Sequence, residues 1–256
     1  MSEDVASHRS SKMSLSMLVD IYGLEPLIRF LLPAPEKRSV EIKTLQEGGQ
    51  SRIICLCGAF CVDGGRVWSR WMRDFRRYFP ETEVIVINAF YYYWEQDHKI
   101  IEDLIAEGVT LVSDNKPTYM ISFSFGGLIA KAIISRSKSH RIRAALSMAT
   151  EHRGHLPRIA HMRDQLLKTP LDIDVPLFTF GGLFDVIVWP WTTQTEHSVH
   201  RFLPVGHFAF VRSPKARAKV LDVLRKVIAN DRDITHSPAI IRSGGVCVMR
   251  PERMSR

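Results

Sequence analysis

The sequence has no long hydrophobic run. Nowhere in its 256 residues is there a stretch of about 18 apolar residues, the length that a membrane-spanning helix needs. The most apolar candidate, residues 13–32, is interrupted by charged residues and a proline, and it follows a polar leader without a small-residue cleavage site. We therefore predict neither a membrane span nor a signal peptide, and we expect a cytoplasmic protein.

Cysteine is scarce, and its four positions form neither a disulfide pattern nor a metal pattern. Cys55, Cys57 and Cys61 crowd one predicted strand and the loop after it, and Cys247 lies near the end of the chain. This distribution is unlike a disulfide framework and favours a reducing compartment. A zinc site needs two pairs of Cys or His ligands, and Cys57-x₃-Cys61 supplies only one. We expect no metal and no organic cofactor.

Acidic residues are outnumbered, with 27 Asp and Glu against 35 Lys and Arg, which gives a net charge of +8. Much of the excess lies on one predicted helix, as Arg66, Arg70, Arg73, Arg76 and Arg77. We interpret this series as the solvent-exposed face of the helix, and weak contact with an anionic membrane surface is the alternative. No base-reading motif accompanies the charge, so we expect no nucleic-acid partner.

Apolar strands alternate with amphipathic helices from residue 52 onwards, without internal repeats. The predicted strands are 40–44, 52–57, 83–90, 118–124, 141–150, 175–180 and 199–203. The predicted helices are 67–79, 97–112, 125–135, 156–167 and 214–229. This alternation predicts an α/β fold with a doubly wound, mostly parallel sheet and helices on both faces. The first strand should lie at an edge and the second, which is apolar throughout, near the centre.

The chain divides into three parts. We predict a disordered leader at 1–14, a single α/β domain at 15–229 and a flexible tail at 230–256, because 256 residues suit one domain of this class. Residues 15–32 are interpreted as an amphipathic helical arm that packs on the domain. Attachment of this arm to a membrane surface is the alternative.

A serine stands where an apolar strand meets an apolar helix. Ser124 directly follows the predicted strand, and a sharp turn of this kind holds the hydroxyl out of the sheet at a helix N-terminus. The turn packs closely, so the positions two before and two after the serine must be small, and here they are Ser122 and Gly126. The pattern is S-x-S-x-G in place of the usual G-x-S-x-G. An ordinary helix N-cap is the alternative interpretation.

Two further polar residues follow predicted strand ends. A serine is a weak nucleophile until a histidine, oriented by a carboxylate, takes its proton. Asp185 comes shortly after one strand, in apolar surroundings, and His207 follows the last strand. The order Ser124, Asp185, His207 is the one found in α/β-hydrolases. Glu151, which follows an earlier strand, is a competing carboxylate.

The same reaction needs two hydrogen-bond donors for the oxyanion of its intermediate. We predict that they are the backbone amides of Phe125, directly after the serine, and of Ala59, in the loop after the central strand. Aromatic side chains after strand ends suit an apolar acyl group. The predicted pocket residues are Phe60, Tyr91, Tyr92 and Trp94.

Over residues 52–229 the chain resembles the α/β-hydrolase fold family, in particular its lipases and carboxylesterases. The resemblance lies in the turn around Ser124, the acid loop at 180–188, the histidine loop ending in His207, and the strand end Cys57-Gly58, where many members have His-Gly. The segment between Ser124 and Asp185 is already occupied by a predicted helix, strand and helix, so we expect only a minimal cap. The resemblance implies a serine hydrolase that cleaves a small-molecule carboxylic ester with an apolar acyl group through an acyl-enzyme.

Other functions are compatible with these residues. A thioesterase or acyltransferase would use the same three side chains, and a catalytically silent relative would serve as a binding protein. Haloalkane and epoxide hydrolases are disfavoured, because they carry an aspartate at the position of Ser124.

Overall fold

In a computed structural model of the protein, the described residues are 39–58, 64–89, 94–137, 139–153, 163–164, 166 and 175–236. They form a seven-stranded sheet in the order β1-β3-β2-β4-β5-β6-β7. The strands are β1 (Glu41–Gln46), β2 (Ser51–Leu56), β3 (Thr82–Asn88), β4 (Thr118–Phe123), β5 (Ile142–Met148), β6 (Leu177–Gly182) and β7 (Ser198–Leu203). Neighbouring strands are parallel, except that β1 is antiparallel to β3.

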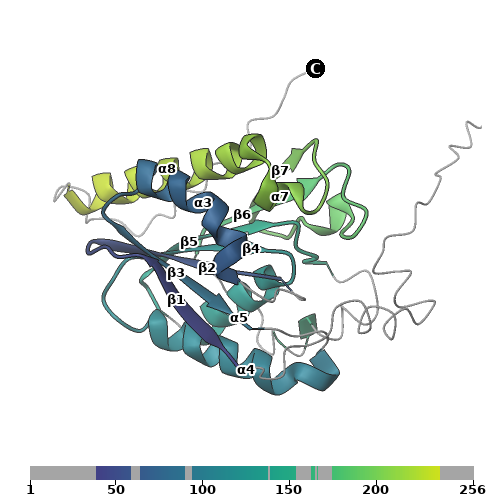
Figure 1. Cartoon of the computed structure of the whole chain (residues 1–256), viewed down its shortest axis with the longest axis horizontal. Coiled ribbons are helices and arrows are strands. Elements are labelled where there is room, and N and C mark those ends of the chain that lie inside the picture. The colour runs from purple at the N-terminus through teal and green to yellow at the C-terminus, as the bar shows by residue number, and fades with distance from the viewer. Residues whose placement is uncertain are drawn as a thin grey trace, which may run out of the picture.

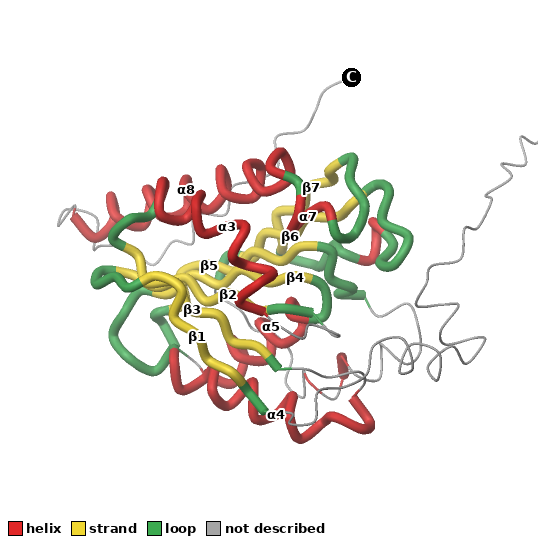
Figure 2. Tube along the Cα trace, in the orientation of Figure 1, coloured by secondary structure: helices red, strands yellow, loops and turns green. Residues whose placement is uncertain are grey.

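Helices cover both faces of this sheet. They include α3 (Gly64–Tyr78), α4 (Trp94–Leu111), α5 (Gly126–Ser137), the short α7 (Ala209–Arg212) and α8 (Pro214–His236). α3 and α8 lie on one face, and α4 and α5 lie on the other (Figure 1). Figure 2 shows the resulting three layers, with the strands between two layers of helices. The predicted doubly wound, mostly parallel sheet is confirmed.

The strand positions also agree with the sequence. β1 lies at an edge and is mostly exposed, whereas β2 lies inside the sheet and is buried at every residue. In β2, Ile53 belongs to the core that contains Trp68 of α3 and Leu224 of α8. The next residue, Ile54, belongs to the core on the opposite face, with Ile101 of α4. Because successive side chains point to opposite faces and both faces are covered, the strand is apolar throughout.

Helix α3 separates its apolar residues from its basic ones. Trp68, Trp71 and Phe75 recur at i, i+3 and i+4 spacing and are fully buried. The five arginines of the basic series are all exposed. The series therefore lies on the exposed face of α3.

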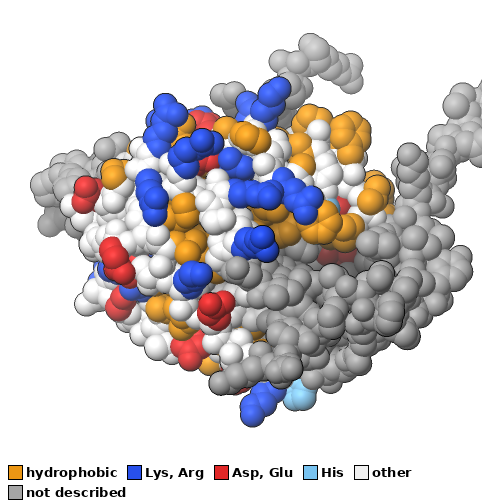
Figure 3. All heavy atoms as spheres, in the orientation of Figure 1, with side chains coloured by type: hydrophobic (Ala, Val, Ile, Leu, Met, Phe, Trp, Pro, Cys, Tyr) orange, Lys and Arg blue, Asp and Glu red, His pale blue; other side chains and the backbone are white. Residues whose placement is uncertain are grey.

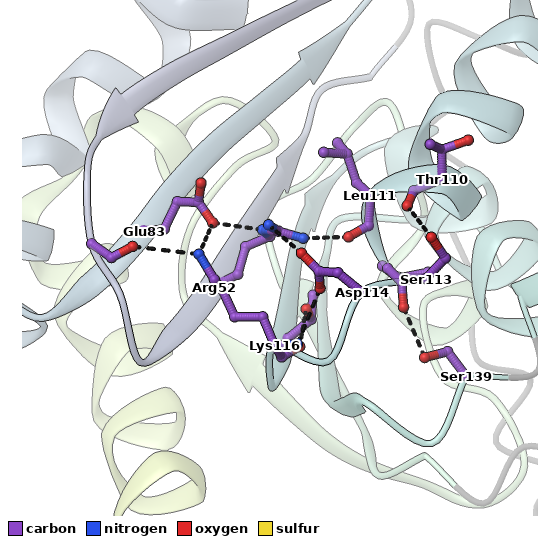
Figure 4. A network of polar contacts seen from close by, with 11 residues as sticks. Arg52, Glu83, Thr110, Leu111, Ser113, Asp114, Lys116 and Ser139 are labelled. Atoms are coloured by element: carbon purple, nitrogen blue, oxygen red, sulfur yellow. Dashed lines mark hydrogen bonds and ion pairs between the residues drawn. The ribbon is translucent and has the colours of Figure 1, made fainter.

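The amino ends of β2, β3 and β4 are joined by a network of ion pairs (Figure 4). Nε of Arg52 donates to Oε2 of Glu83 at 2.7 Å, and Nζ of Lys116 donates to the same oxygen at 2.9 Å. Arg52 also donates to Oδ2 of Asp114 at 2.8 Å and to the carbonyl of Leu111. Burial alone would raise the pKa of Glu83, but the hydrogen bonds from Lys116 and Arg52 outweigh it and lower that pKa.

The last helix is longer than predicted. α8 ends at His236 rather than near residue 229. Asp231 supplies the reason, because Oη of Tyr119 donates to its Oδ2 at 2.8 Å and Nε of Arg143 lies 3.6 Å from its Oδ1. These contacts hold the last turns against β4 and β5, although Asn and Asp are weak helix formers. α4 likewise begins at Trp94, three residues before its predicted start.

Several predicted features lie outside the described residues. They are the leader at 1–14, the arm at 15–32, the tail beyond residue 236, most of the predicted helix at 156–167, Cys61 and Cys247. Cys55 and Cys57 are buried, and burial raises the pKa of the Cys55 thiol. None of the described helices is long and apolar enough to cross a bilayer.

Candidate active site

Ser124 occupies a strained turn between β4 and α5. Its φ of 54° places it in the left-handed region, which costs a non-glycine residue about 1–3 kcal/mol. Hydrogen bonds hold this geometry: the Ser124 amide donates to the carbonyl of Met148 at 2.8 Å, and the Ser124 carbonyl accepts from the amide of Gly127 at 3.0 Å. The strain is therefore maintained by β5 on one side and by the first turn of α5 on the other.

Close packing explains the small residues around this turn. A Cβ on Gly126 would lie 2.6 Å from the carbonyl oxygen of Cys57, and a Cβ on Gly58 would lie 2.6 Å from Cβ of Ser124. Ser122 fits where glycine is usual because its Oγ donates to the carbonyl of Leu146 at 3.1 Å. The S-x-S-x-G pattern therefore forms the turn without an unpaired buried hydroxyl.

The structure brings Ser124, His207 and Asp185 into one line of contacts. Nε2 of His207 lies 3.2 Å from Oγ of Ser124, and Nδ1 of His207 lies 2.8 Å from Oδ2 of Asp185. The other carboxylate oxygen, Oδ1, accepts from the amides of Ile187 at 2.9 Å and Val188 at 2.8 Å. Both the histidine and the aspartate are buried. The acid is therefore held by its own loop, which directs its free oxygen at the imidazole.

This arrangement decides what the histidine can do. The carboxylate accepts a hydrogen bond from Nδ1–H, so in the neutral imidazole Nε2 carries the lone pair that faces the serine hydroxyl. The Phe123 ring centroid is 4.9 Å from that of His207, and the Phe208 ring meets His207 edge-on at 5.2 Å. The imidazole is thus positioned by a carboxylate and two rings, with its basic nitrogen toward Ser124.

Comparisons with known proteins identify the fold that holds these three side chains. The sequence matches no protein-family model and no curated protein. The structure is similar to a carboxylesterase of the thaumarchaeon Nitrososphaera gargenis, with a TM-score of 0.56 and 12% identity over 78% of this chain and 99% of that one. The chain has the α/β-hydrolase fold.

Two further structures share the α/β-hydrolase fold with this chain. The thioesterase domain from the curacin biosynthetic pathway has a TM-score of 0.55 at 11% identity, and it covers 75% of this chain and 97% of its own. The enol-lactonase of Burkholderia xenovorans has a TM-score of 0.52 at 15% identity, with the same coverage. Such low identities establish the fold and leave the chemistry to the site itself.

In an α/β-hydrolase fold the oxyanion donors lie beside the nucleophile. Phe125 directly follows Ser124 and immediately precedes α5, which suits its amide for this role. Ala59 lies outside the described residues, next to Gly58, whose backbone approaches Ser124. Both assignments stay predictions.

The predicted pocket is mostly outside the described residues. This holds for Phe60, Tyr91 and Tyr92, while Trp94 is the first residue of α4 and its side chain is not described. The same is true of residues 154–162 and 167–174, between the serine and the acid, so the predicted minimal cap stays a prediction. Among the described residues, no three His, Cys, Asp or Glu side chains are grouped to hold a metal ion.

The two candidate acids are separated by the structure. Asp185 is the carboxylate that contacts the imidazole of His207. Glu151 is buried after the end of β5. Sequence order alone left both open, because both follow strand ends. The loop that turns back from β6 towards β7 decides between them, since Phe184 donates from its amide to the carbonyl of Val205 at 3.1 Å.

Behind the serine lies a polar chain that the sequence analysis missed. Oγ1 of Thr150 donates to the Ser124 carbonyl at 2.7 Å, and Oγ of Ser147 donates to Thr150 at 2.7 Å. Nε2 of His152 lies 3.0 Å from Oγ of Ser147. Burial, and then the nearby charges of Lys131 and His200, hold the pKa of His152 well below its usual value, so it is neutral.

The sheet register shows why residues 147–152 lie beside the turn at Ser124. Ser122 of β4 pairs in register with Ser147 of β5, so polar residues at the carboxyl end of β5 lie beside the turn. Only the register reveals it, because no motif joins residues 147–152 to the serine.

Proposed function

We propose that the protein is a serine hydrolase that cleaves a carboxylic ester with an apolar acyl group. The single observation that carries this proposal is the position of His207, whose two nitrogens face Ser124 and Asp185. A neutral imidazole held in this way is a general base for a serine hydroxyl. The similar carboxylesterase and enol-lactonase support an ester-type substrate by analogy of fold.

The reaction follows from these contacts. Oγ of Ser124 attacks the ester carbonyl carbon as Nε2 of His207 takes the hydroxyl proton, and Asp185 stabilises the imidazolium. The amides of Phe125 and Ala59 hold the oxyanion. The intermediate collapses, the C–O bond to the alcohol breaks, and His207 returns the proton to the leaving oxygen. Water then attacks the acyl-enzyme with His207 as base, which releases the acid and restores Ser124.

Labelling with a fluorophosphonate probe tests the nucleophile. The wild-type protein should be labelled, and Ser124→Ala should lose both labelling and turnover of a p-nitrophenyl ester, the latter by on the order of 10⁶-fold. Ser122→Ala is the matched control, since it removes a hydroxyl two residues away and should keep the label. Labelling of Ser124→Ala would overturn the assignment, and a folded wild-type protein without labelling would indicate a binding protein.

A thioesterase is the second candidate, favoured by the similarity to the curacin thioesterase domain. Turnover of matched acyl esters and acyl thioesters decides between the two leaving groups. For either, turnover should rise about fourfold per added methylene until the pocket is full, since each buried methylene contributes about 0.8 kcal/mol.

A further inference from the structure

Exposed apolar side chains gather in the sequence beside Asp185 and His207 of the candidate site. Of the nine large apolar residues that are exposed in the described part of the chain, seven lie between residues 183 and 208. Four of them flank the acid and the histidine and are called the apolar rim here: Leu183, Phe184, Val186 and Phe208. Phe184 is 68% exposed and Phe208 is 51% exposed. The surface of a soluble protein rarely carries a group of exposed apolar side chains unless they contact a partner.

The rim is built into the two loops that hold the site. Leu183, Phe184 and Val186 surround Asp185, and Phe208 follows His207 and meets its ring edge-on. The two loops are joined by backbone hydrogen bonds, from Leu183 to Leu203 at 2.8 Å and from Phe184 to Val205. The rim is therefore one surface beside the reacting groups.

A basic surface adjoins the rim. The Arg212 guanidinium lies 5.5 Å from the centroid of the Phe208 ring. α7, which ends at Arg212, contacts α3, whose first turns carry Arg70 and Arg73. Lys215 opens α8 nearby. We call Arg70, Arg73, Arg212 and Lys215 the basic collar. Figure 3 shows blue side chains over α3 and α8 beside orange ones near α7 and β7.

The collar has no counter-charges among the described residues. Its four side chains are exposed, and none forms an ion pair there. The acids of α3 and α8 whose side chains are described are engaged elsewhere: Asp74 pairs with Arg217 at 3.1 Å, Asp222 with Lys226 at 2.9 Å and Asp231 with Arg143 at 3.6 Å. An exposed surface of one sign beside protruding apolar side chains fits a partner that is anionic at its surface and apolar beneath.

We propose that the rim and the collar dock the protein on an anionic lipid membrane. The rim enters the interface between headgroups and acyl chains, and the collar lies against the anionic headgroups. A second copy of the chain fits less well, because a symmetric contact would bring two basic collars together. Docking in this orientation turns the loops that hold Asp185 and His207 towards the bilayer, where apolar esters dissolve. The docking itself does not rest on the proposed catalysis.

Vesicle sedimentation with full-length Ser124→Ala protein tests the docking separately from turnover. The protein should bind vesicles of phosphatidylcholine with phosphatidylglycerol, should bind phosphatidylcholine alone far more weakly, and should lose affinity as salt rises. Arg212→Gln/Lys215→Gln should weaken binding about 25-fold, or about fivefold per charge. Lys99→Gln/Arg141→Gln, which removes two exposed or half-exposed charges away from α3 and α8, is the matched control and should bind normally.

The apolar rim has its own variant. Leu183→Ser/Phe184→Ser in the Ser124→Ala protein should weaken vesicle binding at least about tenfold, with little change in its melting temperature. Unchanged vesicle binding in both double variants would overturn the proposal. A concentration-dependent dimer that this rim variant abolishes, or a large fall in its melting temperature, would also overturn it by showing that protein covers the rim.

Discussion

The two ends of the central strands carry polar clusters of opposite character. At the amino ends of β2, β3 and β4, the buried Arg52 and the partly buried Lys116 share the carboxylate of Glu83, so each of these charges meets an opposite one (Figure 4). At the carboxyl ends, Ser124 is held in a strained backbone with its hydroxyl facing the imidazole of His207.

The two clusters differ in what their hydrogen bonds and ion pairs do. In the amino-end network the charged groups pair with one another, and such a network stabilises or specifies the fold. At the other end, loops from separate strands converge, which is where open α/β sheets place their ligands. There the hydrogen bonds position a base against a nucleophile, so we expect substitutions at the carboxyl ends to change activity and those at the amino ends to change stability.

Among substitutions that keep Ser124, the largest effect should come from Asp185→Asn. The new amide oxygen can still accept from Ile187 and Val188, but the amide nitrogen would face Nδ1 of His207 and favour the wrong tautomer. Turnover should fall about 10⁴-fold with little change in the unfolding free energy. Glu151→Gln is the control and should leave turnover nearly unchanged. Steady-state kinetics with urea denaturation measures both, and the reverse ranking would make Glu151 the acid.

Arg52→Met should have the converse effect. It leaves the partly buried Glu83 with only Lys116 as a partner and removes the hydrogen bonds to Asp114 and Leu111, so the unfolding free energy should fall by about 1–3 kcal/mol. Turnover per folded molecule should be unchanged. Urea denaturation of this variant beside Arg141→Met, which alters a less buried side chain at the start of β5, measures the loss. If turnover fell while the unfolding free energy stayed unchanged, the expected difference between the amino and carboxyl ends of the strands would be wrong.

Lys131 contrasts with the paired charges at the amino ends, because it is a buried cation with no carboxylate partner among the described residues. Its Nζ lies 3.3 Å from Oγ1 of Thr195. Burial, and then the charge of Arg163, lowers its pKa from 10.5 to about 8. The unfolded chain therefore binds more protons between these values, so the penalty is full below about pH 8 and fades as pH rises towards 10.5.

Replacing this lysine should therefore stabilise the protein. Lys131→Met should raise the unfolding free energy near neutral pH by up to roughly 3 kcal/mol, and the gain should shrink at alkaline pH. Lys219→Met, at an exposed position of α8, is the control. A gain that is independent of pH would show that packing, rather than the charge, is responsible.

The smallest effect concerns the departure from the usual turn pattern. Ser122→Gly restores G-x-S-x-G but removes the hydrogen bond to Leu146 and loosens a strand, so it should cost about 1–2 kcal/mol of stability. Ser122→Ala should lose only the hydrogen-bond part. Both should retain turnover, and a large loss in either would place Ser122 in the reaction.

The sequence by itself determined the order of strands and helices, because buried parallel strands need continuous apolar runs and covering helices need apolar stripes. It also indicated the turn at Ser124, since the small residues that close packing requires are neighbours in the chain. Asp185 and His207 could be singled out because both follow strand ends.

Only the tertiary structure decided which groups meet. His207 and Ser124 lie 83 positions apart, and the sheet register and the joined β6 and β7 loops bring Asp185 rather than Glu151 to the imidazole. Tertiary packing also produces the series of hydrogen bonds from His152 to the Ser124 carbonyl and the extension of α8 through Asp231. It likewise places the apolar rim beside the basic collar. Local periodicity encodes which side of an element is buried, whereas contacts between distant elements depend on how those elements pack.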